Sequence, residues 1–146
     1  MSRVSVEQLN KAKEKVVSAV ALVNRSVNKL PPYDPNKDYS MDEIEPYDAL
    51  CDRFIRAVEV CIKYFRTYEY VFFAVSSDSL RDGLNIMEKS GLITSTLIWL
   101  DMRDVRNRIV HDYLPKQLKL MYDCIMNEFF AELLYAESRI KAFTLD

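Results

Sequence analysis

Glycine and proline are scarce in this chain, and their scarcity constrains the fold more than any other feature. Only two of the 146 residues are glycine, and the five prolines lie in or beside segments that read as loops. Glycine and proline are the residues that most often end helices and form turns. Since 49% of the residues are apolar and a chain of this length can bury its own core, we expect one all-α domain over residues 1–146.

Three amphipathic helices are predicted in the first two thirds of the chain. Ser5 and Gln8 form a capping-box pattern before "VEQLNKAKEKVVSAVALVNRSV", which indicates a helix start. A second helix is expected from about Pro46 into "YEYVFFAV", and a third, shorter one over "SDSLRDGLNIMEKS", ending at Gly91. Residues 30–45 between the first two helices, rich in Pro, Asp and Tyr, are expected to form a long connector in which Ser40 caps only a short turn.

Two further helices are predicted on either side of Pro115. The fourth starts near Thr94 and ends around Asp112 or Tyr113, because a proline disfavours helical geometry in the residue before it. Pro115 is itself a favourable first residue for the last helix. Apolar residues recur at three- or four-residue steps and predict the buried stripes Leu50, Phe54, Val58, Cys61, Phe65 and Tyr68; Ile98, Met102, Val105 and Ile109; and Leu118, Met121, Ile125, Phe129, Leu133 and Ile140.

Short loops between long helices favour antiparallel neighbours. We therefore expect an antiparallel, up-and-down four-helix bundle with one additional short helix. The alternative is a pair of helical hairpins that is complete only as a dimer.

Several functional classes are disfavoured by composition. The N-terminus "MSRVSVEQLNKAKEK" has no apolar core typical of a secretory signal, and the longest apolar run, "YVFFAV", is too short to cross a bilayer. Cys51, Cys61 and Cys124 are widely spaced, without a CxxC pair, so we expect buried free thiols in the cytoplasm and no metal site. The net charge of −2 argues against a protein that coats nucleic acid, so any contact with RNA is expected to be local.

The segment "DMRDVRNRIVHDYLPKQ", residues 101–117, concentrates polar groups that packing does not require. At about 100° per residue, Arg103, Asn107 and His111 project from the side opposite the apolar stripe, and Arg106 lies on its flank. A core histidine is therefore disfavoured. Periodicity alone leaves open an idle surface histidine, with Arg103, Arg106 and Arg108 in ordinary pairs with neighbouring aspartates.

The chemistry of these groups suits metal-free cleavage of RNA. Histidine transfers protons near neutral pH, and arginine matches phosphate and stabilises charge on phosphorus. Asn107, one turn before His111, would orient the imidazole. Because the chain has a single histidine and the reaction profits from both an acid and a base, two chains meeting at this face would supply both.

The sequence "RNRIVHDY" resembles the signature of HEPN domains, and most closely that of the HepT-like branch. In that branch the pattern is Arg-Asn, three residues, His, any residue, Tyr, which Arg106, Asn107, His111 and Tyr113 match position by position. The chain differs from the usual pattern in its long acidic connector and in having Leu114–Pro115 where a glycine-containing turn often follows.

The resemblance implies a helical bundle that dimerises with its motifs at a shared cleft. It also implies a metal-independent ribonuclease toxin without cofactors, in which Arg106, Asn107 and His111 are catalytic and Arg103 and Arg108 contact RNA phosphate. Its partner would be a minimal nucleotidyltransferase antitoxin that adenylylates Tyr113.

Two other functions remain open from the sequence. A related branch has been described as the substrate-binding subunit of nucleotidyltransferases, so the chain is alternatively a catalytically silent scaffold. A purely structural bundle is the third hypothesis. The chain is not itself the nucleotidyltransferase, because neither Gly83 nor Gly91 opens a phosphate-binding loop before paired aspartates.

Overall fold

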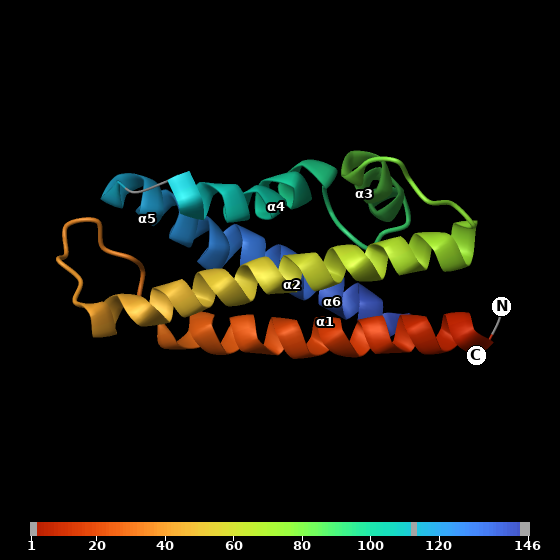
Figure 1. Ribbon diagram of the computed structural model, residues 1–146, viewed down its shortest axis with the longest axis horizontal. Helices are drawn as coiled ribbons and strands as arrows, with labels where there is room; N and C mark the ends of the chain where they lie inside the picture. Colours follow the sequence, from red (N-terminus) through yellow and green to blue (C-terminus); the bar gives the residue numbers. More distant parts are fainter. Residues whose placement is uncertain (1–2, 112–113, 144–146) are drawn as a thin grey trace.

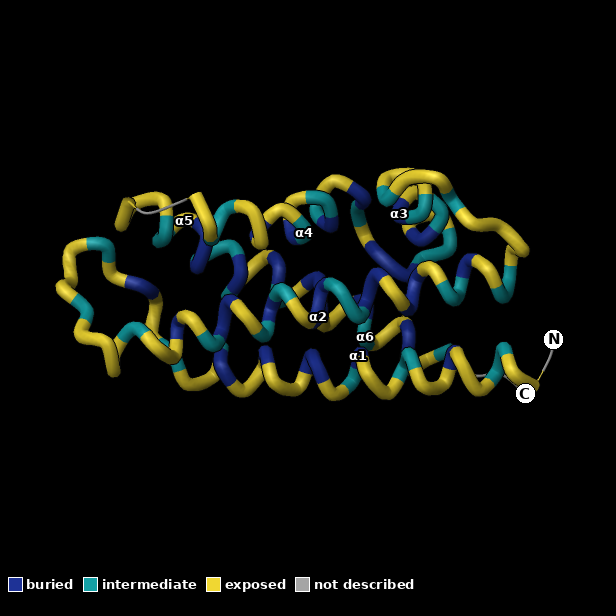
Figure 2. The backbone as a smooth tube through the Cα atoms, viewed as in Figure 1, coloured by how far each residue is buried: buried dark blue, intermediate teal, exposed yellow. Residues whose placement is uncertain are grey.

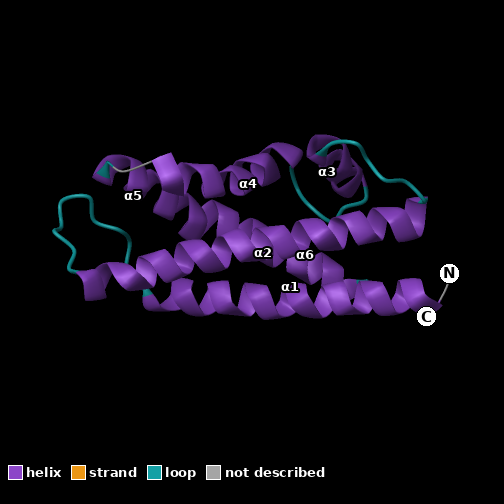
Figure 3. Cartoon of the chain, viewed as in Figure 1, coloured by secondary structure: helices purple, strands orange, loops and turns teal. Residues whose placement is uncertain are grey.

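The computed structural model describes residues 3–111 and 114–143, and within these ranges the chain is helical apart from its connections, with no strand (Figure 3). The expectation of an all-α chain is confirmed. The elements in chain order are α1 (Arg3–Lys29), α2 (Met41–Phe73), α3 (Leu80–Lys89), α4 (Thr96–His111), α5 (Pro115–Cys124), the π-helical turn η1 (Ile125–Phe129) and α6 (Phe130–Ala142).

The two longest helices, α1 and α2, lie side by side and run in opposite directions along the long axis (Figure 1). The short helix α3 and the helix α4 pack on α2, and α4 runs opposite to α2, in the same direction along the long axis as α1. The rod formed by α5, η1 and α6 then returns obliquely, and α6 packs against both α1 and α2. None of the helices in the described ranges combines the length and the apolar character that crossing a bilayer requires.

The predicted apolar stripes face one shared core (Figure 2). The stripe residues that are buried include Leu50, Phe54, Val58, Cys61 and Phe65 on α2, Met102 and Val105 on α4, and Met121, Ile125, Phe129, Leu133 and Ile140 on the last rod. Tyr68, Ile98, Ile109 and Leu118 are half-buried and pack against the same core. Helical periodicity therefore predicted which sides of α2, α4 and the last rod face inward.

The second helix begins at Met41, so its predicted start at Pro46 was wrong. Ser40 is the N-cap: its hydroxyl accepts from the Glu43 N–H at 3.2 Å, and the Glu43 carboxylate accepts from the Ser40 N–H at 3.2 Å. This reciprocal capping box starts the long helix and not a short turn. Lys37 adds an ion pair to Glu43, and the resulting hydrogen bond, together with those from Ser40, lowers the pKa of Glu43 to about 2. Pro46 lies inside the helix, so the capping box and the burial of Tyr47 outweigh its missing N–H.

Two other predicted helix starts and the single last helix also need correction. The first helix is already formed at Arg3, so Ser5 lies inside it and does not cap it. The fourth helix begins at Thr96, and Thr94 belongs to the preceding loop. The last helix starts at Pro115 as predicted, but it widens into the π-helical turn η1 before α6. Within that turn the Asn127 side chain donates to the Asp123 carbonyl at 2.8 Å.

Tyrosine rings fasten the connector to the end of the helical core. Tyr33 stacks on Tyr39 with ring centroids 4.9 Å apart, and Tyr33 also contacts Tyr47 of α2 and Tyr122 of α5. The Tyr47 hydroxyl donates to the carbonyl of Pro31 at 2.6 Å. The connector is therefore held against α2 and α5.

A buried carboxylate fixes the start of α4. Glu132 on α6 is 5% exposed, and it accepts from the Thr94 N–H at 2.9 Å, the Thr94 hydroxyl at 2.5 Å and the Trp99 indole N–H at 2.9 Å. Glu88 on α3 accepts from the Thr96 N–H at 2.8 Å. Glu88 thus satisfies a first-turn N–H that has no partner within the helix, while Glu132 binds the loop before α4 and the Trp99 side chain. They also tie α4 to α3 and α6.

We expect Glu132→Ala to lower the free energy of unfolding by about 3 kcal/mol, because it leaves buried N–H and O–H donors without an acceptor. Urea denaturation followed by circular dichroism measures this. The matched control is Glu128→Ala, which removes an exposed carboxylate from η1 and should change stability by less than about 0.5 kcal/mol. Equal stability of the two variants would show that Glu132 does not anchor α4.

Candidate active site

The polar residues of the segment singled out in the sequence lie mainly on the exposed side of α4, towards the end of that helix. Met102 and Val105 are buried, whereas Arg106, Asn107 and His111 are exposed. His111 is the last residue of α4, and no hydrogen bond or ion pair is found for it within the described part of the chain. The core therefore makes no use of the histidine, which leaves its imidazole accessible to a ligand.

Asn107 does not contact His111 in this structure. Its side-chain amide donates to the Asp104 carboxylate at 3.2 Å, one turn earlier on the same helix. The predicted role of Asn107 in orienting the imidazole is therefore not seen in this arrangement. The amide would have to leave Asp104 to serve that role.

Arg103 and Arg106 share one carboxylate, that of Glu59 on α2. The Arg103 Nε lies 2.9 Å from Glu59 Oε1, and the Arg106 Nη1 lies 3.6 Å from the same oxygen. The Arg103 and Glu59 side chains are about one third exposed (30% and 34%), and that of Arg106 is 51% exposed. These arginines thus pair across helices, and not with the neighbouring aspartates considered in the sequence.

Glu59 is the site residue that sequence reasoning missed. It directly follows buried Val58 on α2 and belongs to no recognisable motif. Its partners lie more than forty positions further along the chain, so neither helical periodicity nor local spacing connects them. The packing of α2 against α4, in which Phe65 and Trp99 meet edge to face at 5.0 Å, brings the groups together.

Arg108 lies on another side of α4, towards α5. Burial raises the pKa of the half-buried Cys124 thiol on α5, and the positive charge of Arg108 opposes that rise. The charge of Arg108 is therefore felt at Cys124 on α5, whereas Arg103 and Arg106 meet Glu59 on α2. The structure therefore brings Arg103, assigned to RNA phosphate, together with the predicted catalytic Arg106, and it does not bring Arg103 together with Arg108.

The start of α5 agrees with the prediction made from Pro115. Leu114 has an extended backbone conformation, and Pro115 occupies the first turn of α5. Tyr113, predicted to be the modified residue, lies outside the described residues, as does Asp112. A shallow groove between the connector and the start of α5 is lined by Pro35, Asn36 and residues 114–117.

The cysteines do not offer a competing nucleophile. Burial raises the pKa of Cys51 to about 12 and raises that of Cys61 as well. Both therefore remain neutral thiols at physiological pH, and the thiolate is the reactive form. Within the described ranges no group of three or more His, Cys, Asp or Glu side chains is placed to hold a metal ion.

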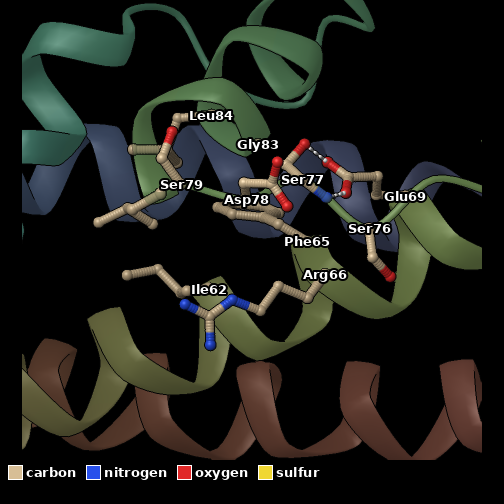
Figure 4. A pocket seen from close by; sticks show the side chains of 11 residues that line it. Ile62, Phe65, Arg66, Glu69, Ser76, Ser77, Asp78, Ser79, Gly83 and Leu84 are labelled. Atoms are coloured by element: carbon tan, nitrogen blue, oxygen red, sulfur yellow. Dashed lines mark hydrogen bonds between the residues drawn. The ribbon is translucent and has the colours of Figure 1, made fainter.

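A cavity of about 190 Å³ lies away from His111, between α2 and the loop that leads into α3 (Figure 4). Its lining includes Phe65, Arg66 and Glu69. The Glu69 carboxylate accepts from the Ser77 N–H at 2.6 Å and from the Ser77 hydroxyl at 2.9 Å. Glu69 thus orders the loop between α2 and α3, and the cavity includes none of the residues singled out on α4.

Comparison with known proteins identifies a fold. No family model matches the chain, and no curated protein matches it. Among solved structures, a chain of the crystal structure of a toxin-antitoxin MntA-HpeT mutant is similar with a TM-score of 0.65 and 19% sequence identity. The match covers 89% of this chain and 99% of that chain. Since this similarity covers nearly the whole domain and agrees with the fold implied by "RNRIVHDY", the chain has a HepT-like HEPN fold.

Proposed function

We propose that this protein is the metal-independent ribonuclease toxin of a toxin–antitoxin module, built as an antiparallel four-helix bundle with the additional short helix α3. The observation that carries the proposal is the exposure of both Arg106 and His111 on α4. Both are exposed near the end of a helix whose other side is buried, and neither contributes to the core. The similarity to a toxin–antitoxin structure supports the same function.

The proposed reaction is attack of the RNA 2′-hydroxyl on the adjacent phosphorus. A bond forms between the 2′-oxygen and phosphorus, the bond from phosphorus to the 5′-oxygen breaks, and a 2′,3′-cyclic phosphate and a 5′-hydroxyl result. One imidazole removes the proton from the 2′-hydroxyl, and another group protonates the leaving 5′-oxygen. The Arg106 guanidinium donates to the phosphate oxygens as negative charge builds on them.

The position of the two groups on α4 supports a dimer. A step of five residues turns about 140° around a helix and advances about 7.5 Å, so Arg106 faces the α2 side while His111 faces outward. One chain thus presents Arg106 and His111, its single histidine, in different directions. Two copies that meet along α4 would place a histidine from each chain at one cleft.

The exposed Leu97 on α4 favours this dimer, and we expect a stable dimer at micromolar concentration in light scattering. Leu97 is 64% exposed, and the half-buried Leu100 shares the outer face with Asn107 and His111. Leu97→Glu should shift the protein towards monomer, because it would bury a charge in the interface.

The control for dimerisation is Leu22→Glu on α1, which lies on the far side of α2 from α4 (Figure 1). Leu22 is 40% exposed, and its substitution should leave the dimer intact. A wild-type protein that remains monomeric would leave the mechanism without its second histidine, and the nuclease proposal would fail with it.

We expect the protein to cleave RNA in the presence of EDTA, and His111→Ala to lower the rate by about 10²–10⁴-fold, as loss of a positioned acid or base does. Arg106→Ala should impair cleavage comparably, through loss of charge stabilisation. Arg56→Ala is the control, because Arg56 pairs with Asp52 on α2 and lies outside the candidate site. A gel assay of labelled RNA and growth arrest in cells measure both effects. Undiminished toxicity of His111→Ala would refute the chemistry whatever the fold.

Control by a nucleotidyltransferase partner is proposed at Tyr113. The tyrosine oxygen would attack the α-phosphorus of ATP, forming an AMP ester and releasing pyrophosphate. The new phosphate would compete with RNA for Arg103 and Arg106 and so inactivate the site. Intact-mass measurement after co-expression with the partner should show added AMP that is absent from Tyr113→Phe.

The same variant separates the toxin from the scaffold alternative. Tyr113→Phe should stay toxic with the partner present, because it cannot accept AMP. Full neutralisation of Tyr113→Phe would mean that the partner inhibits by binding alone, and it would favour a scaffold.

A further inference from the structure

Glu59 occupies the arginines that an incoming phosphate would need. A single oxygen, Oε1, lies within ion-pair distance of both Arg103 and Arg106. Carboxylate and phosphate accept from the same fork of guanidinium donors. RNA binding at this face therefore means replacing one anion by another, and not filling a vacant cationic site.

Fold stability alone gives little reason for this cluster. Ion pairs with side chains one third to one half exposed contribute little to folding, because water and salt screen them. Several other ion pairs join residues four apart on one helix, such as Arg3 with Glu7 on α1 and Arg56 with Asp52 on α2. Glu59 instead joins α2 to α4, and its partners are one motif arginine and the arginine one turn before it.

We infer that Glu59 is a built-in competitor for RNA phosphate, which weakens the binding of polyanions to the α4 face. The inference rests on the proposed RNA-directed function. Arg103 is held closely through its Nε at 2.9 Å, whereas Arg106 is in looser contact at 3.6 Å and is half exposed. Arg106 exchanges its carboxylate for phosphate first, and Arg103 follows only when the bound strand displaces Glu59.

This arrangement makes the arginines selective for RNA. An anion that contacts only the arginines binds weakly, because its new contacts replace the ion pairs to Glu59 that are lost. An RNA strand that also reaches His111, at the end of the same helix, gains further contacts and is retained. The slightly acidic net charge of −2 works in the same direction by lowering non-specific attraction of nucleic acid.

The test is the affinity for an RNA oligonucleotide with 2′-O-methyl groups, which blocks the attacking hydroxyl and so separates binding from cleavage. Glu59→Gln removes the charge and keeps the shape. It should bind about tenfold more tightly at low salt, since a nearby opposing charge is lost. The plot of log K against log salt should steepen by about 0.7 for each arginine released to contact phosphate.

The matched control is Glu7→Gln, the same substitution at a carboxylate that pairs with Arg3 at the start of α1. It changes the net charge equally and should leave affinity and salt dependence close to wild type. Glu59→Asp, which keeps the charge on a shorter side chain, should fall between wild type and Glu59→Gln. Adding Arg103→Gln to Glu59→Gln should remove most of the gain.

Each outcome bears on the inference or on the proposed function. Binding by Glu59→Gln that equals Glu7→Gln, falls below wild type, or is undetectable overturns the competitor role. A gain that survives Arg103→Gln and Arg106→Gln together overturns it as well. If Glu59→Gln gains affinity as expected but the wild type does not cleave unmodified RNA, the competitor role of Glu59 stands and the ribonuclease proposal is refuted.

Discussion

The buried carboxylate of Glu132 sets the position of α4, and the candidate site depends on that position. Three donors from Thr94 and Trp99 converge on this side chain. They hold the loop before α4 and the Trp99 side chain near its start against α6, while Glu88 on α3 accepts from the Thr96 N–H. Because a helix is rigid at about 100° per residue, fixing its start also fixes the direction of each later residue. Arg103 and Arg106 consequently face α2, and His111 faces outward at the other end of α4.

The charges on α4 divide into groups with different surroundings. Arg103 and Arg106 are drawn to Glu59, Asn107 is bound to Asp104, and Arg108 lies towards α5. Residues close together on the sequence therefore differ in how readily each can meet a ligand. Proximity in a motif shows which groups are present at a site. The partners that each group already has determine the free energy of transferring it to a ligand.

The connector and the helix ends place structured elements around the same end of α4. Tyrosine rings hold the connector against α2 and α5, and Pro35 and Asn36 line a groove with the first residues of α5. Such rings contribute buried area and specific edge contacts. The long connector is thus packed structure that forms one wall of the groove at the start of α5.

The sequence by itself determined the features that depend on local chain geometry. Helical periodicity predicted the buried stripes of α2, α4 and the last rod, and Pro115 marked the start of α5. The eight residues "RNRIVHDY" predicted the fold that the structural similarity then supported. These predictions succeed because they rest on backbone sterics and on a repeat of 3.6 residues, which act between near neighbours.

Tertiary structure decided the contacts between helices. Nothing in the local pattern indicates that Glu59 meets Arg103 and Arg106, or that Glu132 accepts from Trp99, since these partners are far apart in the chain. The start of α2 also differs from the expected start at Pro46, because the reciprocal capping by Ser40 and Glu43 begins the helix at Met41 and the core packing of the helix tolerates the proline. The physical reason is that side-chain pairing across helices depends on how two rigid rods are rotated against each other. That rotation is set by the packing of the whole core.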